Sequence, residues 1–255
     1  MSIIANFFKS IRIGQPGVSV GLITRRSLVQ IQLPLLIFKM LICGIDDSGR
    51  GPVLGPMILV GVCVEEKDEE KLKSIKVKDS KLLTPKKRQE LYKKILKIAK
   101  SYEISITQPL EIDSTNYQGI SLNDLEGIKA VEIINVLKPD KAFLDCPSPN
   151  KKAWQNFIYE RLKNKKVELI VEHKADQKFP VVSAASIIAK VTRDEEIEKI
   201  KKQVKVDFGS GYSHDEKTIK FLKENLEKYP EIFRKTWATV KNLKKEKKQK
   251  KLEEF

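Results

Sequence analysis

The chain has 255 residues, of which 41% are hydrophobic and 33% charged, and this composition fits a soluble globular protein. Its formal net charge of +15 at pH 7 favours a polyanionic partner such as nucleic acid. A solvated surface rich in lysine and glutamate, which is common in heat-adapted proteins, is the alternative explanation of the same charge.

The cysteine pattern and the hydropathy exclude two classes of protein. The three cysteines, Cys43, Cys63 and Cys146, are widely spaced and include no C-x-x-C pair, which indicates reduced, buried thiols in a cytosolic protein. No apolar run approaches the roughly 18 residues that a membrane span needs. We therefore expect a cytoplasmic protein without membrane contact, and we expect it to be a monomer.

Residues 1–39 differ in composition from the rest of the chain. They carry five basic residues and no acidic residue, and they lack a sustained hydrophobic period. A transit peptide, a disordered arm and an upstream start codon with Met40 as the true start all fit this composition. We therefore treat residues 1–39 as an atypical extension that takes no part in the fold.

From Leu41 onward the patterns predict strands and helices in turn. Apolar or alternating runs predict strands over 41–45, 57–64, 102–107, 141–145 and 167–172. Caps and helical periodicity predict helices over 85–98, 121–137, 151–162, 181–204, 217–226 and 232–243. Because strands come first as neighbours and then alternate with helices, we expect an α/β fold with a mixed sheet flanked by helices.

Aspartates follow three of the predicted strands. Asp46 and Asp47 follow the run 41–45, Asp145 closes the run 141–145, and Asp176 comes shortly after the last strand. Ligands gather where the strands of an α/β sheet end, so these side chains are expected to converge. Converging carboxylates raise one another's pKa unless a cation is present, and oxygen ligands suit Mg²⁺ or Mn²⁺. Each aspartate alone also fits a turn or a helix cap.

Longer stretches of sequence point to one family. They are G-I-D-D-S-G-R-G-P-V-L-G-P over 44–56, K-D-S-K over 78–81, H-K-A-D over 173–176 with V-S-A-A-S-I-I-A-K-V-T-R-D over 182–194, and G-S-G-Y over 209–212. In this order they resemble the motifs of type 2 ribonuclease H (RNase HII), and its archaeal branch most of all. The resemblance covers the chain from about Leu41 to the C-terminus.

The resemblance implies a fold and an activity. The fold is ribonuclease H-like, with a catalytic domain over 40–206, a C-terminal helical subdomain over 207–245 and a flexible tail over 246–255. The activity is endonucleolytic hydrolysis of the RNA strand of RNA–DNA hybrids and of ribonucleotide sites in duplex DNA, leaving 3′-hydroxyl and 5′-phosphate ends. Two divalent metal ions, Mg²⁺ or Mn²⁺, are implied as cofactors, and a role in DNA replication and repair follows.

The resemblance also assigns the metal ligands. The four acidic ligands of the family correspond to Asp46, Asp47, Asp145 and Asp176. The second of them is normally Glu, and Asp47 is shorter by one C–C bond, about 1.5 Å. Since Mg²⁺ demands strict geometry and larger ions tolerate more, we expect reduced or manganese-biased activity. A protein that binds hybrids but cleaves them weakly is the alternative function.

Substrate contacts are implied in the same way. The junction-sensing Gly-Arg-Gly of the family corresponds to Gly49, Arg50 and Gly51, and its sugar-stacking tyrosine corresponds to Tyr212. Glycines let the backbone approach a ribose, whose 2′-hydroxyl marks RNA, and arginine can fork onto a phosphate. An ordinary tight turn and ordinary packing of the tyrosine are the alternatives.

Two lysines and two histidines complete the candidates. Lys81 and Lys190 lie within the family motifs and are expected to contact phosphates, with plain surface charge as the alternative. His173 and His214 have no Cys, His or Ser partner pattern in the sequence, so we expect a structural or solvent-exposed role for both.

The last residues of the chain, Q-K-K-L-E-E-F over 249–255, fit the pattern Q-x-x-Φ-x-x-aromatic. This resembles the peptide with which archaeal relatives bind the sliding clamp (PCNA), and it implies that Gln249, Leu252 and Phe255 contact that partner. One helical turn would bring Leu252 and Phe255 to the same side. A frayed Lys/Glu tail with an incidental Phe is the alternative.

Overall fold

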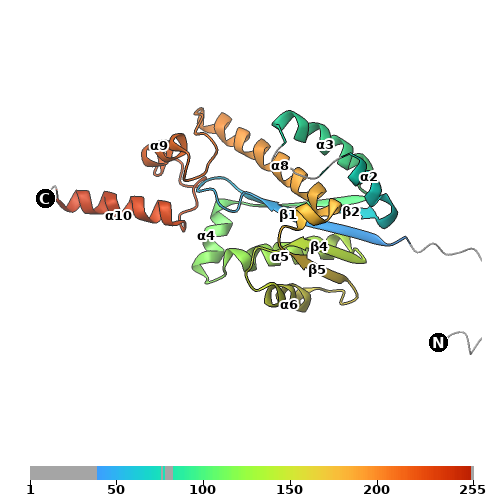
Figure 1. The fold of residues 1–255 in the computed structure, drawn as a ribbon. Helices are drawn as coiled ribbons and strands as arrows, with labels where there is room; N and C mark the ends of the chain where they lie inside the picture. Colours follow the sequence, from blue (N-terminus) through green and yellow to red (C-terminus); the bar gives the residue numbers. More distant parts are fainter. Residues whose placement is uncertain (1–38, 76, 78–82, 254–255) are drawn as a thin grey trace, which may run out of the picture. The chain divides into compact units, whose positions relative to one another are not determined.

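Five strands form one sheet in the order β3-β2-β1-β4-β5 (Figure 1). They are β1 (Leu41–Ser48), β2 (Met57–Glu65), β3 (Ser101–Thr107), β4 (Lys141–Asp145) and β5 (Glu168–Glu172). Strands β1, β2 and β3 pair antiparallel, whereas β1, β4 and β5 pair parallel. The predicted mixed α/β sheet is thereby confirmed, and each of the five predicted strands is present.

The structure is a computed structural model, and it describes residues 39–75, 77 and 83–253. These residues belong to one compact unit, Lys39–Phe255. The expected N-terminal extension therefore lies outside the described residues except for Lys39.

Helices connect the strands and follow them. They are α2 (Glu69–Ser74) after the short 3-10 turn η2 (Glu66–Asp68), α3 (Pro85–Ile98), α4 (Pro109–Tyr117), α5 (Leu122–Leu137), α6 (Lys151–Arg161), α7 (Ala175–Lys178), α8 (Pro180–Val204), α9 (Glu216–Asn225) and α10 (Ala238–Glu253). Side-chain caps begin the helices α3 and α5. The hydroxyl oxygen of Thr84 accepts a hydrogen bond from the N–H of Lys87 at 3.3 Å, and that of Ser121 accepts one from Asp124 at 3.1 Å.

Helices cover both faces of the sheet. Helices α2, α3 and α8 pack over one face and α5 and α6 over the other, each layer around its own buried apolar core (Figure 1). Helix α8 lies directly against β1, because a side-chain carbon at Gly44 would clash with the backbone of Val181. This close packing holds α8 beside the part of β1 that carries Asp46.

A third core lies at the C-terminal end of the chain. It joins α9 and α10 to the last turns of α8 and to Leu54, which lies in the link between β1 and β2 and forms an isolated bridge with Phe233. The β1–β2 link is therefore packed against a segment that lies far away in the sequence. The subdomain boundary at 206/207 remains a prediction.

The C-terminal helix differs from the prediction in both of its bounds. The sequence predicts a helix over 232–243, but helix α10 begins at Ala238 and continues through Glu253, into the segment expected to be a flexible tail. Residues before 238 are not helical because their backbone groups bond elsewhere: Arg234 N–H donates to Val53 at 2.9 Å, and Thr236 N–H donates to Asp113 at 2.9 Å. The later residues are mostly Lys, Glu and Gln, which have good helix propensity.

Candidate active site

Asp46 and Asp47 lie next to each other near the end of β1, which runs on through Ser48 rather than turning after Ile45. Side chains alternate along a strand, and Ile42 belongs to the core under α8 whereas Cys43 belongs to the core under α5. The same alternation puts Asp46 on the α8 side of the sheet and Asp47 on the α5 side. Both side chains still reach one neighbourhood, because one cleft is lined by Asp47 and by Ser186, whose hydroxyl bonds Asp46.

The two carboxylates nevertheless interact with each other and with Asp145. Burial raises the pKa of Asp46 well above its usual range, the charge of Asp47 raises it next, and the charge of Asp145 raises it further. Hydrogen bonds from the Ser186 hydroxyl and from the backbone N–H of Asp47, at 2.8 Å for the latter, oppose these effects. Negative charge is thus concentrated at this edge of the sheet.

A hydrogen bond joins the side chain of Asp145 to the backbone of Ala175, the residue before Asp176. Asp145 is the last residue of β4, and its Oδ1 accepts the N–H of Ala175 at 2.7 Å. Asp176 follows Ala175 on the short helix α7, and its side chain is buried. The parallel strands β1 and β4 end at the same edge of the sheet, so the four aspartates come from one neighbourhood of the fold.

The chemistry of these side chains fits a divalent metal ion. In the part of the chain that the structure describes, no group of three His, Cys, Asp or Glu side chains has a geometry that would already hold one ion. Burial and the charges of Asp47 and Asp145 raise the pKa of Asp46, and a hard cation would stabilise the charged carboxylates against both effects. Carboxylate oxygen is the ligand that Mg²⁺ and Mn²⁺ prefer.

A cleft of about 340 Å³ lies beside Asp47 and contains most of the residues expected to contact the substrate. It is lined by Asp47, Ser48, Gly49, Arg50, Gly51, Ser186, Lys190 and Tyr212. The structure thus brings one expected metal ligand together with the Gly-Arg-Gly loop, Lys190 and Tyr212. Lys81 lies outside the described residues. Ser186 was missed in the sequence, although it is one of two serines, with Ser183, in an otherwise apolar stretch of α8, which is a usable signal.

Arg50 is held from the side of α5. Its Nη1 donates to the buried carboxylate of Glu126, and its Nη2 donates to the side-chain oxygen of Asn123 at 2.7 Å. Burial lowers the pKa of Arg50, while the charges of Asp47 and Asp145 act in the opposite direction. The guanidinium therefore lies within the field of the carboxylates, with its orientation set by α5.

Tyr212 lines the same cleft, beside Gly51. A side-chain carbon at Gly51 would lie 3.5 Å from the ring of Tyr212, so the glycine leaves room between the loop and the ring. The guanidinium of Arg193 lies 5.3 Å from the centre of the same ring, and its Nη2 donates to the backbone oxygen of Ser210 at 3.3 Å. Arg193 was not singled out in the sequence, because its partners lie on a distant loop.

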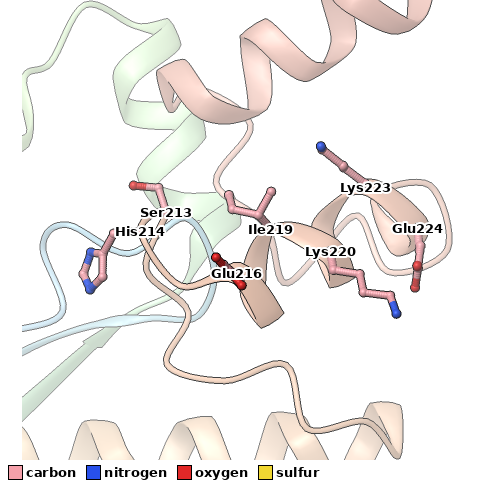
Figure 2. Close-up of a pocket in the computed structure, with 7 residues that line it drawn as sticks. All are labelled: Ser213, His214, Glu216, Ile219, Lys220, Lys223 and Glu224. Carbon is pink, nitrogen blue, oxygen red and sulfur yellow. The ribbon is translucent and has the colours of Figure 1, made fainter.

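The histidines and cysteines have no part in this cleft. His173 is exposed, with its Nδ1 3.2 Å from the backbone oxygen of Cys146, and the three cysteines are buried free thiols. Exposed His214 lines a separate hollow on α9, with Ser213, Glu216, Ile219, Lys220, Lys223 and Glu224 (Figure 2). That hollow includes none of the four aspartates.

Two further expectations concern the membrane and the sliding clamp. Within residues 39–75, 77 and 83–253, the structure contains no helix with the length and apolar character needed to cross a bilayer. Gln249 is exposed on α10, whereas Phe255 and the side chain of Leu252 lie outside the described part of the chain.

Comparison with known proteins identifies the family. The family model for ribonuclease HII matches residues 43–240. Ribonuclease HII of Pyrococcus furiosus is 49% identical over 209 residues, which cover 80% of this chain and 91% of that protein. Ribonuclease HII of Methanosarcina acetivorans is 45% identical over 217 residues, which cover 81% of this chain and 97% of that protein.

Solved structures agree with the sequence matches. The crystal structure of ribonuclease H2 from Pyrococcus horikoshii has a TM-score of 0.75 at 42% identity, covering 81% of this chain and 98% of that one. The RNase HII of the PCNA:RNase HII complex from Archaeoglobus fulgidus has a TM-score of 0.71 at 36% identity, covering 78% of this chain and 96% of that one. The chain therefore belongs to the ribonuclease HII family, the type 2 ribonucleases H that cleave the RNA strand of RNA–DNA hybrids, and its relatives here are archaeal.

Proposed function

We propose that this enzyme hydrolyses phosphodiester bonds on the RNA strand of hybrids and at single ribonucleotides within duplex DNA, leaving 3′-hydroxyl and 5′-phosphate ends. The observation that carries the proposal is the cleft beside Asp47, in which a carboxylate near the end of β1 faces the Gly49–Gly51 loop and Tyr212. A group that ligates metal and groups suited to a ribose thus border the same space.

Asp46, Asp47, Asp145 and Asp176 would hold divalent ions, Mg²⁺ or Mn²⁺. When bound, such ions activate a water molecule and stabilise the leaving oxygen of the phosphodiester. Neighbouring donors keep the ligand oxygens in place. The backbone N–H of Ala175 bonds Asp145, and the hydroxyl of Ser186 bonds Asp46. Burial of Asp46 makes its charged form costly without a cation, so we propose that metal and carboxylate charge are mutually dependent here.

The residues that line the cleft would select the substrate. The backbone of Gly49–Gly51 is close enough to the cleft to contact a 2′-hydroxyl, and Tyr212 offers a flat face to the sugar. Lys190, whose Nζ lies 3.5 Å from Asp194, is half-exposed on α8 and would contact a phosphate. These contacts select a ribose without reading its base.

A catalytically weak hybrid-binding protein is the second candidate, and Asp47 in place of the longer Glu favours it. A metal-dependent cleavage assay on an RNA–DNA hybrid decides between the two. We expect the parent protein to cleave the hybrid. Asp145→Asn should lower this turnover by about 100-fold or more, which is the loss typical for a group that stabilises charge in a transition state. Calorimetric titration with Mn²⁺ should show weaker binding in the same variant.

A matched control is Glu172→Gln, which neutralises a carboxylate at the end of the neighbouring strand β5. Glu172 is bound by Lys151 and Lys178, each at 2.7 Å, and does not line the cleft. We expect this variant to cleave like the parent protein. Equal losses in Asp145→Asn and Glu172→Gln would mean that the assay reports the stability of this edge of the sheet and not catalysis.

We also propose that Gln249, Leu252 and Phe255 bind the sliding clamp of the replication machinery. The support is the peptide pattern at the end of the chain and a relative solved as a PCNA:RNase HII complex, with which 78% of this chain aligns.

A further inference from the structure

Arg234 is a buried cation, and its guanidinium donates hydrogen bonds to three backbone carbonyls. Its relative exposure is 0% and it is among the largest fully buried side chains. Nε donates to the oxygen of Gly55 at 3.0 Å, Nη1 to that of Arg50 at 2.7 Å, and Nη2 to that of Gly49 at 2.6 Å. One guanidinium therefore binds three carbonyls of the link between β1 and β2.

Burying a charged group is costly unless its hydrogen bonds are satisfied. Burial lowers the pKa of Arg234 to about 9, with the positive charge of Arg193 acting in the same direction. An apolar residue would fill this position at lower cost, as Phe233 does beside it in the same core. The retained guanidinium fork matches three separate acceptors at fixed directions, which an apolar side chain cannot do.

The segment that carries Arg234 is itself fixed at several points. Nε1 of Trp237 donates to the oxygen of Gly51 at 3.3 Å. The carboxylate of Asp113, buried on α4, accepts the backbone N–H of Lys235 at 2.7 Å and that of Thr236 at 2.9 Å. The carbonyls of all three loop residues, Gly49, Arg50 and Gly51, are thereby bonded to the segment 234–237.

We infer that Arg234 is a positioning residue for ribose recognition: it holds the carbonyls of Gly49 and Arg50 on the inner side of the loop, so that the outer side of the loop faces the cleft. This inference rests on the proposed function, in which the Gly49–Gly51 loop contacts the ribose. Gly49 has a φ of +91°, which glycine adopts about as readily as a negative value, so neighbouring contacts specify which conformation the loop keeps. The fork of Arg234 supplies that specification from a part of the chain about 180 residues away.

The test uses Arg234→Lys in the full-length protein. A lysine ammonium donates from one nitrogen and cannot span three carbonyls as the fork does. On duplex DNA with one ribonucleotide we expect kcat/KM to fall by about 100-fold, the loss that a misplacement of roughly 1 Å produces. We expect Mn²⁺ affinity to stay within about twofold of the parent value, because the aspartates are not among the bonds that Arg234 makes.

The control is Leu222→Ala, which creates a cavity in the same C-terminal core without touching the loop. Measured at a temperature where circular dichroism shows both variants folded, Leu222→Ala should cleave within about threefold of the parent. In Arg234→Ala, methylguanidinium at non-denaturing concentration should restore part of the lost turnover, and it should do nothing for Leu222→Ala. Rescue of this kind reports a missing guanidinium and not a loosened core.

The inference is overturned if Arg234→Lys keeps near-parent kcat/KM, or if Leu222→Ala loses as much activity. Gly51→Val separates the two levels of the proposal, because a side-chain carbon at Gly51 would meet the ring of Tyr212 at 3.5 Å, so the branched valine would fill the space between the loop and the ring. Normal cleavage by Gly51→Val would show that the loop does not contact the ribose, and the proposed recognition would fail with it. Impaired Gly51→Val together with normal Arg234→Lys would overturn only the role of Arg234.

Discussion

Asp47 is the residue at which this chain departs from its family motif, and the structure gives that departure a physical setting. The side chain is half-buried, lines the cleft, and contributes to the raised pKa of Asp46. A carboxylate is therefore retained, with a reach shorter by about 1.5 Å. Strict octahedral geometry makes Mg²⁺ more sensitive to that shortening than Mn²⁺.

Asp47→Glu should consequently raise magnesium-dependent turnover, by about tenfold if the gain matches the usual effect of tuning a metal site. The gain with Mn²⁺ should be smaller. Steady-state cleavage of a hybrid across a range of each metal measures both values. A sharp loss with both metals would indicate instead that the surrounding side chains have adapted to the shorter carboxylate.

At the same scale, the sequence predicted some site residues and missed others for a clear reason. Asp46 and Tyr212 stand in local motifs that can be read directly, and Asp145 closes a predicted strand. Glu126 and Arg234 contact the loop from positions 76 and more than 180 residues away, so only the folded chain reveals them. The four-ligand assignment remains a prediction that rests on the family motif.

At the scale of the elements, local signals predicted most of the fold correctly. Alternation and caps gave the strands and the starts of α3 and α5, because those signals depend on residues a few positions apart. The helices α2, α4 and α7 were missed, since six, nine and four residues leave little room for a helical period. Residues 232–237 were predicted as helix although tertiary hydrogen bonds hold them in another conformation.

The clamp-binding prediction belongs to α10 and the end of the chain. Deleting residues 249–255 should abolish binding to the sliding clamp of the same organism, measured by calorimetry. Burial of Leu252 and Phe255 would contribute roughly 1.5–3 kcal/mol each. Allowing for the entropy lost on association, we expect a micromolar dissociation constant, or about −8 kcal/mol.

Cleavage of a short free hybrid should be unchanged by the same deletion, because none of the four aspartates lies in the deleted segment. Phe255→Ala is the point control and should lose most of the clamp affinity. If Phe255→Ala binds as tightly as the full-length protein, the pattern at the end of the chain is accidental.

For the molecule as a whole, the net charge and the local charge at the active site have opposite signs. A net charge of +15 favours approach to a polyanion, yet negative charge is concentrated at one edge of the sheet, at the end of β1. Repulsion between carboxylates and phosphates makes this arrangement unfavourable for a protein that only binds nucleic acid. It is favourable when divalent ions lie between the two, which is why we regard the chain as an enzyme of the family and not a binding module.

The most direct test compares three duplexes of the same sequence: an RNA–DNA hybrid, a DNA duplex with a single ribonucleotide, and a DNA duplex with none. Each is incubated with the protein in Mg²⁺, in Mn²⁺ and in excess chelator, and the product ends are identified. We predict cleavage of the first two with 3′-hydroxyl ends, no cleavage of the third because it lacks a 2′-hydroxyl, and no cleavage of any duplex in chelator. Equal cleavage of the all-DNA duplex, or cleavage that persists in chelator, would contradict this account.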